Sequence, residues 1–304
     1  MSQSKNGKRP ALFLLYEGIS GSAQDRIEIV KQACRRQLLD CRALDSLEVD
    51  YANLPEPQPG DMLFNVGRGS VRLETLLYRP YVATFRTCGA TRFTNGDDTT
   101  VHCAAMQVMG LPQPRTIHRL PSDNHRLVDY VEILGGFPIV IKIVGGTLGV
   151  GTMIIESMRS LRSVVDYLRT TGDEFILREF IDAAHVARLC VLGDRVVASL
   201  KYAIAADDFR GLPYRMGGCR MDFGPEIDAL AINAAKAAEH EFTGVDIIID
   251  KAGLPYVLEV NPPSNFVAYE REMDIPIGDM IVSHLMGKAK TVTSLAPNLL
   301  ATVE

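Results

Sequence analysis

Apolar and polar positions in the first part of the chain predict strands and helices in turn. The apolar run Ala11–Tyr16 is typical of a buried strand, and a loop at 18–21 leads into a helical pattern over 23–39. Two shorter strands are expected at 41–44 and 61–66. This alternation of strand and helix predicts a small parallel sheet covered by helices.

A second pattern follows, in which a glycine-rich loop lies between two apolar runs. Apolar residues at 161, 164, 165 and 168 have the spacing of a helix with one buried face. The elements predicted here are a helix over 97–111, strands over 138–144 and 152–156, a helix around 161–168 and a strand over 174–181.

The remainder of the chain predicts two β-hairpins on either side of a helix. Gly193-Asp194 between apolar runs is a turn signal, which indicates a hairpin over 187–202. An alanine-rich helix is expected over 227–242, and a second hairpin over 244–260. The predicted divisions are an N-terminal domain at 1–96, a central lobe at 97–185, a C-terminal lobe at 186–290 and a tail at 291–304.

Composition narrows the class of protein. With 304 residues, of which 47% are hydrophobic and 23% charged, the chain has enough apolar material for a large core. A formal net charge of -5 argues against a dedicated nucleic-acid-binding protein. No apolar run approaches the roughly 20 residues of a membrane span, the N-terminus lacks the pattern of a signal peptide, and the cysteines form no CxxC pair. We therefore expect a cytoplasmic enzyme with no nucleic-acid or membrane partner.

Lys142 is the first residue that suggests chemistry, because it interrupts the apolar run at 138–144 directly before the glycines. Burying an unpaired ammonium costs several kcal/mol, so a lysine here needs an anionic partner. The glycines allow backbone N–H groups to approach phosphates closely. We expect Lys142 to meet phosphate rather than a protein carboxylate. The same pattern also fits a solvated lysine on an edge strand beside a flexible turn.

Glu179, followed by Phe180 and Ile181, ends a predicted strand. Exposed strand backbone can pair with the edge of an adenine ring, and a carboxylate beside it can face the amino group of the base. Taken alone, the pattern also fits a solvated glutamate at a strand end.

Asp246, Glu259 and Asn261 form the most specific pattern in the chain. Glu259 and Asn261 are two positions apart on one predicted strand, so their side chains point to the same face. If Asp246 lies on the partner strand of that hairpin, three oxygen ligands converge, and such ligands suit Mg²⁺ bound to substrate phosphates. Acidic residues on a solvent-facing hairpin are the alternative, which the surrounding Ile, Val and Leu oppose. In the metal-free protein we expect these groups to repel one another.

Taken in order, these three groups resemble the ATP-grasp superfamily, most closely its branch of ribosomal-S6-type glutamate ligases, lysine-biosynthesis ligases and glutathione synthetases. The resemblance runs from about Asp97 to Met286. The segments in register are 137–142, the glycine loop, 179–181, 208–210, 215–218, 244–246 and 258–261. It implies an α/β ATP-grasp fold with a small N-terminal parallel-sheet domain and two grasping lobes.

The resemblance also implies an activity, an ATP-dependent ligase that joins a carboxylate to an amine through an acyl phosphate. The substrates would be an amino acid, a small peptide or a natural-product intermediate, and the cofactors ATP and one or two Mg²⁺ ions, with Mn²⁺ as an alternative. The candidate residues are Lys142, Gly146, Thr147, Gly149, Gly151, Glu179, Phe180 and Ile181 for ATP, Asp246, Glu259 and Asn261 for metal, Arg188 and Arg215 for catalysis, and Arg68, Ser70, Arg72 and Arg210 for substrate.

Several alternatives stay open. Arg68, Ser70 and Arg72 equally fit the solvated start of a helix. Thr99 stands where the family usually has a second phosphate-binding lysine, and Val186 where it usually has an acid for the ribose. Intramolecular ring closure, an ATP-grasp kinase and an ATP-binding regulatory protein without turnover are the rival functions. We further expect a homo-oligomer, either a dimer or a tetramer.

Overall fold

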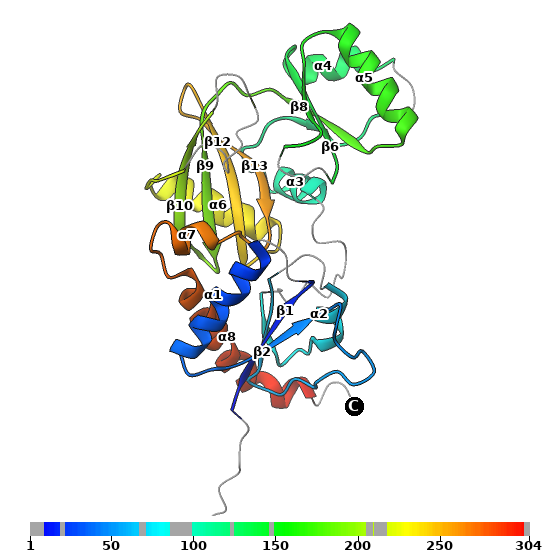
Figure 1. The fold of residues 1–304 in the computed structure, drawn as a ribbon. Coiled ribbons are helices and arrows are strands. Elements are labelled where there is room, and N and C mark those ends of the chain that lie inside the picture. The colour runs from blue at the N-terminus through cyan, green and yellow to red at the C-terminus, as the bar shows by residue number, and fades with distance from the viewer. Residues whose placement is uncertain are drawn as a thin grey trace, which may run out of the picture. The chain divides into compact units, whose positions relative to one another are not determined.

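The computed structural model describes residues 9–18, 22–66, 71–85, 99–121, 125–145, 149–204, 209 and 218–300 (Figure 1). The chain divides into two compact units. Unit 1 contains residues 1–94, 239–242 and 263–304, and unit 2 contains residues 95–238 and 243–262. Over the described ranges, every helix is too short or too polar to cross a membrane.

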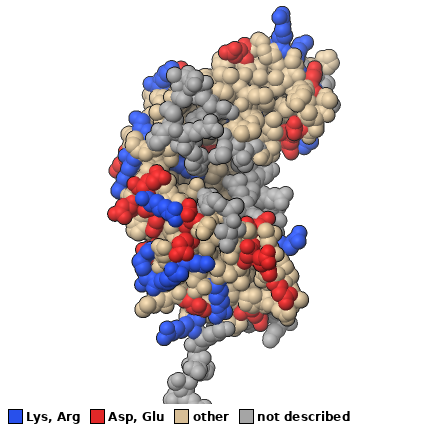
Figure 2. All heavy atoms as spheres, in the orientation of Figure 1, with Lys and Arg blue, Asp and Glu red and all other residues tan. Residues whose placement is uncertain are grey.

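Charged side chains of both signs are interspersed over the face shown in Figure 2. This mixture accords with a sequence that has 32 basic and 37 acidic residues, because neither sign strongly outnumbers the other.

Unit 1 is built on a four-stranded parallel sheet, which confirms the parallel sheet predicted for the N-terminal part. Its strands are β1 (Ala11–Tyr16), β2 (Asp40–Asp45), β3 (Met62–Asn65) and β4 (Ala83–Thr84), in the order β2-β1-β3-β4, and they are joined by α1 (Ser22–Arg36) and α2 (Val71–Leu77). Phe13, Leu15 and Leu63 pack from one face of the sheet against Leu73 and Leu77 of α2. Burial of these apolar side chains holds α2 on the sheet.

The C-terminal helices also belong to unit 1. They are α7 (Val267–Arg271) and α8 (Ile277–Leu300), and α8 packs against α1. Ile277, Ile281 and Leu285 recur at helical spacing and are fully buried. Two predicted divisions are therefore wrong. Residues 263–290 belong to unit 1 rather than to the C-terminal lobe, and residues 291–300 continue α8 instead of forming a tail. The buried stripe holds the first part of the helix, and a helix that has formed extends readily because each further residue adds a hydrogen bond.

The first half of unit 2 is a four-stranded antiparallel sheet packed against two helices. The strands are β5 (Thr116–Ile117), β6 (Ile139–Ile143), β7 (Thr152–Ile155) and β8 (Phe175–Glu179), in the order β5-β8-β6-β7, and the helices are α4 (Leu127–Ile133) and α5 (Met158–Thr171). Ile139, Ile141 and Leu177 point into the core shared with these helices. Because side chains alternate along a strand, Lys142 and Arg178 point to the opposite face.

The second half of unit 2 is a five-stranded sheet in the order β11-β10-β9-β12-β13. Its strands are β9 (Ala183–Leu192), β10 (Arg195–Ala203), β11 (Cys219–Arg220), β12 (Phe242–Asp250) and β13 (Pro255–Asn261). Both predicted hairpins, β9–β10 and β12–β13, are present. The helices α3 (Thr99–Val108) and α6 (Pro225–Ala237) enter one core with β9, β12 and β13. Helix α6 ends before the predicted residue 242, because Phe242 begins β12.

Candidate functional site

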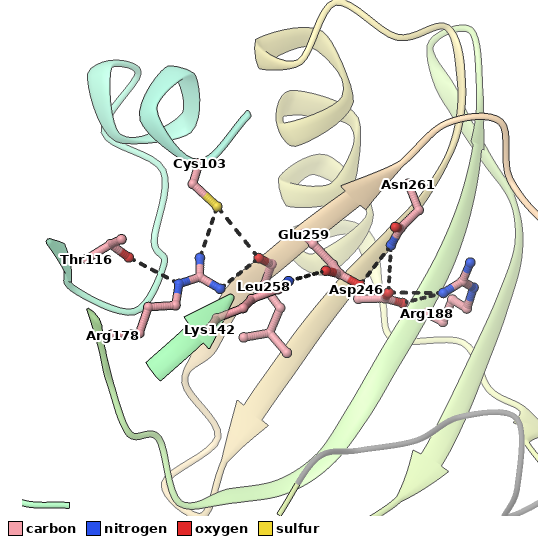
Figure 3. Close-up of polar contacts among 9 residues, drawn as sticks. All are labelled: Cys103, Thr116, Lys142, Arg178, Arg188, Asp246, Leu258, Glu259 and Asn261. Atoms are coloured by element: carbon pink, nitrogen blue, oxygen red, sulfur yellow. Dashed lines mark hydrogen bonds and ion pairs between the residues drawn. The ribbon is translucent and has the colours of Figure 1, made fainter. Parts of the chain in front are cut away.

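Four polar or charged side chains gather on the face of the five-stranded sheet that is turned away from its core. They are Arg188 of β9, Asp246 of β12, and Glu259 and Asn261 of β13 (Figure 3). Their strand neighbours Ala187, Leu189, Val245, Ile247 and Val260 enter the core. Since neighbouring residues of a strand point to opposite faces, the four polar side chains share the other face.

The register of β12 and β13 brings the three predicted metal ligands together. Asp246 is the cross-strand partner of Glu259, and Gly244 is that of Asn261. The Asn261 Nδ2 donates to Asp246 Oδ2 at 3.0 Å and to Glu259 Oε1 at 3.1 Å. The predicted convergence is therefore present, while metal binding by these residues stays a prediction.

Two cations balance the two carboxylates. Lys142 Nζ donates to Glu259 Oε2 at 2.7 Å, and Arg188 Nη1 donates to both carboxylate oxygens of Asp246 at 3.0 Å. Because Lys142 lies on β6, its ion pair joins the two sheets of unit 2. The expectation that Lys142 has no protein carboxylate as its partner in the nucleotide-free protein is wrong, whereas its contact with phosphate stays a prediction. The expected repulsion between Asp246 and Glu259 is present, but Lys142 and Arg188 offset it.

Burial and these charges act differently on the two carboxylates. Desolvation raises the pKa of Asp246 more than the positive charge of Arg188 lowers it, and the neighbouring carboxylate of Glu259 raises it further. Burial also acts to raise the pKa of Glu259, but the Lys142 ammonium and the hydrogen bond from Asn261 outweigh it and lower that pKa to about 2. Glu259 is therefore ionised at neutral pH and has a cation beside it.

The donor set fits a hard divalent cation. Two carboxylates and one amide oxygen are the ligand types that Mg²⁺ prefers. Asn261 directs Nδ2 at both carboxylates here, so its amide would have to turn to present Oδ1 to a cation. Over the described ranges, no three His, Cys, Asp or Glu side chains are grouped for metal binding, so the third protein ligand here would be the amide of Asn261. A cation bound by Asp246 and Glu259 would replace Lys142 as the partner of Glu259.

Glu179 lies at the end of β8, where Arg115 binds its carboxylate. Arg115 donates from Nη2 to Glu179 Oε1 at 2.7 Å and from Nε to Oε2 at 3.0 Å. These hydrogen bonds lower the pKa of Glu179, against the effect of burial. An adenine amino group would have to compete with Arg115 for this carboxylate, whereas the backbone of Phe180 and Ile181 lies just beyond the end of β8. Contact of these residues with adenine stays a prediction.

The glycine loop is described in part. Gly149 and Gly151 both have a positive φ. A Cβ at Gly151 would lie 3.0 Å from the Cβ of Ile143, so the return of the chain into β7 requires a glycine there. Arg72 is exposed on α2. Six predicted residues lie outside the described residues, and they are Gly146, Thr147, Arg215, Arg68, Ser70 and Arg210.

Comparison with known families identifies the fold around this cluster. A family model described as a RimK-like ATP-grasp domain matches residues 101–285, which is more than half of the chain. The match includes Lys142 and the whole stretch from Asp246 to Asn261. The chain belongs to the RimK-like ATP-grasp family. The resemblance and the ATP-grasp fold class predicted from the sequence are thus confirmed.

Sequence relatives in this family bear ligase names. A probable alpha-L-glutamate ligase from Legionella pneumophila (strain Corby) is 29% identical over 188 residues, which cover 61% of this chain and 61% of that protein. The ribosomal protein bS6–L-glutamate ligase of Shigella boydii serotype 4 (strain Sb227) is 32% identical over 190 residues, or 62% of each chain. The matched region thus spans less than two thirds of the length of these relatives.

Solved structures of ATP-grasp ligases share the fold over almost the whole chain. The ATP-grasp ligase PsnB complexed with a minimal precursor has a TM-score of 0.67 at 15% identity, covering 92% of this chain and 99% of that one. The D-alanine–D-alanine ligase from Bacillus anthracis has a TM-score of 0.65 at 14% identity, covering 94% and 99%. At these identities the likeness shows the fold alone.

Sequence reasoning missed Arg115 and Arg178, which hold carboxylate or backbone oxygens beside the candidate site. The signal for Arg178 was present, because an arginine that directly follows the apolar residues Phe175–Leu177 in a strand needs partners as much as Lys142 does. Its partners Cys103 and Leu258 lie 75 and 80 residues away in the sequence and are uncharged. Neither spacing nor charge pattern could therefore reveal them.

Proposed function

We propose that this chain is an ATP-dependent ligase that joins a carboxylate to the amine of an amino acid, with L-glutamate as the first amine to test. The observation that carries the proposal is the cluster in which Lys142, Arg188 and Asn261 surround Asp246 and Glu259. Two carboxylates balanced by two cations are suited to exchange one cation for Mg²⁺ while that cation moves to a phosphate. The names of the relatives, alpha-L-glutamate ligase and bS6–L-glutamate ligase, support an amino acid as the amine.

In this proposal ATP transfers its γ-phosphoryl group to the carboxylate substrate and leaves as ADP, and the amine then attacks the acyl phosphate with release of phosphate. Bound Mg²⁺ would neutralise charge on the phosphates, and a solved PsnB structure is complexed with Mg and ADP. Asp246, Glu259 and Asn261 would hold one or two ions, and Lys142 would leave Glu259 for a phosphate. Arg188 would place its charge beside the transferring phosphoryl group. Such a transfer depends on positioning and charge neutralisation, so the protein needs no covalent nucleophile.

The remaining predicted residues have assigned roles in the same proposal. The backbone of the glycine loop and of Phe180 and Ile181 would bind ATP, and Arg215 would stabilise the acyl intermediate. The substrate carboxylate would be held by Arg68, Ser70, Arg72 and Arg210. A cytoplasmic location and a dimeric or tetrameric assembly remain predictions from the sequence.

A phosphate-release screen tests the proposal. ATP and Mg²⁺ are supplied with pairs of amino acids or peptides, and products are identified by mass spectrometry. We expect release to require both a carboxylate and an amine, and to fall by orders of magnitude in Glu259→Gln. The control Lys251→Met should behave as wild type, because Lys251 forms an exposed ion pair with Asp182.

Each rival function has its own signature in this screen. Phosphate transfer without an amine would indicate a kinase. Release with one substrate that carries both groups would indicate ring closure, and tight ATP binding without turnover would indicate a regulatory protein.

A further inference from the structure

Arg178 links the two sheets of unit 2 through a buried guanidinium. The residue is 5% exposed and lies on β8, immediately before Glu179. Its Nε donates to Thr116 Oγ1, its Nη1 to the carbonyl oxygen of Leu258 and its Nη2 to the sulfur of Cys103, each at 3.1 Å (Figure 3). Thr116 belongs to the neighbouring strand β5, whereas Leu258 lies on β13 and Cys103 on α3. The side chain therefore crosses from one sheet to the other.

The partners of Arg178 in the described part of the chain are all uncharged. Among the residues that the structure describes, the guanidinium donates to a hydroxyl, a carbonyl and a thiol, and forms no ion pair within 4.0 Å. Desolvating a cation without an opposite charge is costly, and apolar side chains of similar volume often replace buried ionic groups without loss of stability. Packing alone therefore does not account for an arginine at this boundary. Its fork of N–H donors instead fixes three separate elements relative to one another.

Lys142 and Arg178 reach the same strand from the same face of the first sheet. Both side chains point to the face of that sheet that is turned away from its core. Lys142 binds the carboxylate of Glu259, and Arg178 binds the carbonyl of the preceding residue, Leu258. In the proposed function, the Lys142 contact must break, because its ammonium goes to phosphate and its carboxylate goes to metal. The Arg178 contact uses neither group and can persist.

We propose that Arg178 is a positioning residue for the nucleotide and metal site, which keeps β13 aligned with β8 when Lys142 leaves Glu259. This inference rests on the proposed function. Arg178 directly precedes the segment Glu179–Ile181 assigned to adenine, and its acceptor Leu258 directly precedes the metal ligand Glu259. It therefore connects the backbone of the nucleotide segment to that of the metal strand. A backbone bond from Val257 N to Pro112 O at 2.9 Å also holds β13, so loss of Arg178 should loosen the alignment without opening it.

The inference is tested by the coupling between nucleotide and metal. The dissociation constant of AMP-PNP is measured by calorimetry in Mg²⁺ and in EDTA, for wild type, Arg178→Lys and the exposed control Arg162→Lys. The ratio of the Kd in EDTA to the Kd in Mg²⁺ reports how much nucleotide and metal each favour binding of the other, because binding coupling is reciprocal. Lysine keeps the charge but cannot reach all three acceptors. We expect the ratio to fall about ten- to a hundredfold in Arg178→Lys, as for loss of one charged hydrogen bond, and to stay at the wild-type value in Arg162→Lys.

A structural role without positioning predicts a different result. If Arg178→Lys melts at a lower temperature but keeps the wild-type ratio, the positioning role is overturned. If Arg178→Lys does not fold, Thr116→Val decides, because without the Thr116 hydroxyl the guanidinium is no longer fixed at Nε and its bond to Leu258 loses its set direction. A several-fold fall of the ratio in Thr116→Val supports the inference, and an unchanged ratio overturns it. A wild type that binds no AMP-PNP in either condition would instead refute the proposed function itself.

Discussion

Replacing Lys142 with methionine should strengthen metal binding to the nucleotide-free protein while it weakens binding of ATP. Methionine keeps an unbranched side chain and removes the ammonium. That ammonium lies 2.7 Å from Glu259 Oε2 and, together with Arg188, balances the charges of Glu259 and Asp246. Without it the cluster carries an uncompensated negative charge, which favours a divalent cation.

The magnitude follows from the burial of the ion pair. The side chains of Lys142 and Glu259 are 21% and 29% exposed. An exposed pair contributes about 0.2–1 kcal/mol, whereas breaking a buried one costs about 3–5 kcal/mol, so this half-buried pair should be worth about 1–3 kcal/mol. Metal affinity should then rise about 5- to 150-fold. Loss of the phosphate contact should raise the ATP Kd about ten- to a hundredfold.

Titration of the nucleotide-free protein with Mn²⁺, followed by electron paramagnetic resonance, measures the first effect, and calorimetry with an ATP analogue measures the second. Lys251→Met removes an exposed lysine and should match wild type in both assays. A folded Lys142→Met protein that binds Mn²⁺ no more tightly than wild type would refute the reasoning, because Lys142 would then not compete with the metal for Glu259.

Three further predictions concern stability. The pKa of Glu259 is lowered to about 2 from 4.5, so its ion pair stabilises the fold above pH 4.5 and loses that effect as the pH falls toward 2. The free energies of unfolding of wild type and Lys142→Met, measured by chemical denaturation, should therefore differ at pH 7 and converge in acid. A difference that stays constant with pH would exclude this ion pair as its source. Glu259→Gln should lower the melting temperature of the metal-free protein, because Lys142 loses its anion, and should abolish most of the rise caused by Mg·ATP; an equal rise in both proteins would count against the metal site. Gly278→Ala should lower the free energy of unfolding by about 1–3 kcal/mol, because its Cβ would lie 2.7 Å from Ile29 Cγ2. The control Gly287→Ala in the same helix has nothing within 4 Å of its Cβ and should raise the free energy of unfolding by up to about 1 kcal/mol. Equal effects of the two substitutions would contradict the packing of α8 on α1.

The metal strand could be predicted from the sequence because its logic is local. The two-residue spacing of Glu259 and Asn261 fixes a common face for their side chains, and the short turn after Asp250 places Asp246 beside them. The turn alone does not give the exact partner, because a shift of the register between Asp246 and Ile247 pairs Asp246 with Glu259 instead of Leu258. Val260 lies between Glu259 and Asn261 in the sequence, so its side chain points to the opposite face, and its apolar character indicates that this opposite face is the buried one. Each of these inferences spans only a few residues of one hairpin.

The ion-pair partners could not be predicted in the same way. Burial of Lys142 shows that it needs an anion, but the choice of Glu259 depends on how two sheets meet, and the two residues are 117 positions apart. The Arg115–Glu179 pair spans 64 positions for the same reason. Partners set by tertiary packing leave no periodic signal in the sequence.

Helix α8 was not among the elements predicted from the sequence, because local propensity and tertiary packing disagree in this segment. Gly287 and Pro297 both count against a helix. The helix nevertheless continues to Leu300, and its buried side chains include Ile281 and Leu285. Most helical stability in proteins comes from such an apolar face rather than from propensity.

Transfer of a heavy oxygen isotope from the carboxylate substrate to inorganic phosphate tests the acyl-phosphate ligase most directly. The carboxylate is labelled in both oxygens and incubated with the protein, ATP, Mg²⁺ and the amine, and the released phosphate is analysed by mass spectrometry. We predict one labelled oxygen in each phosphate, in step with the amide formed, and neither product with Glu259→Gln. Amide formation accompanied by unlabelled phosphate would contradict the mechanism, because the carboxylate oxygen would then never have been bonded to phosphorus.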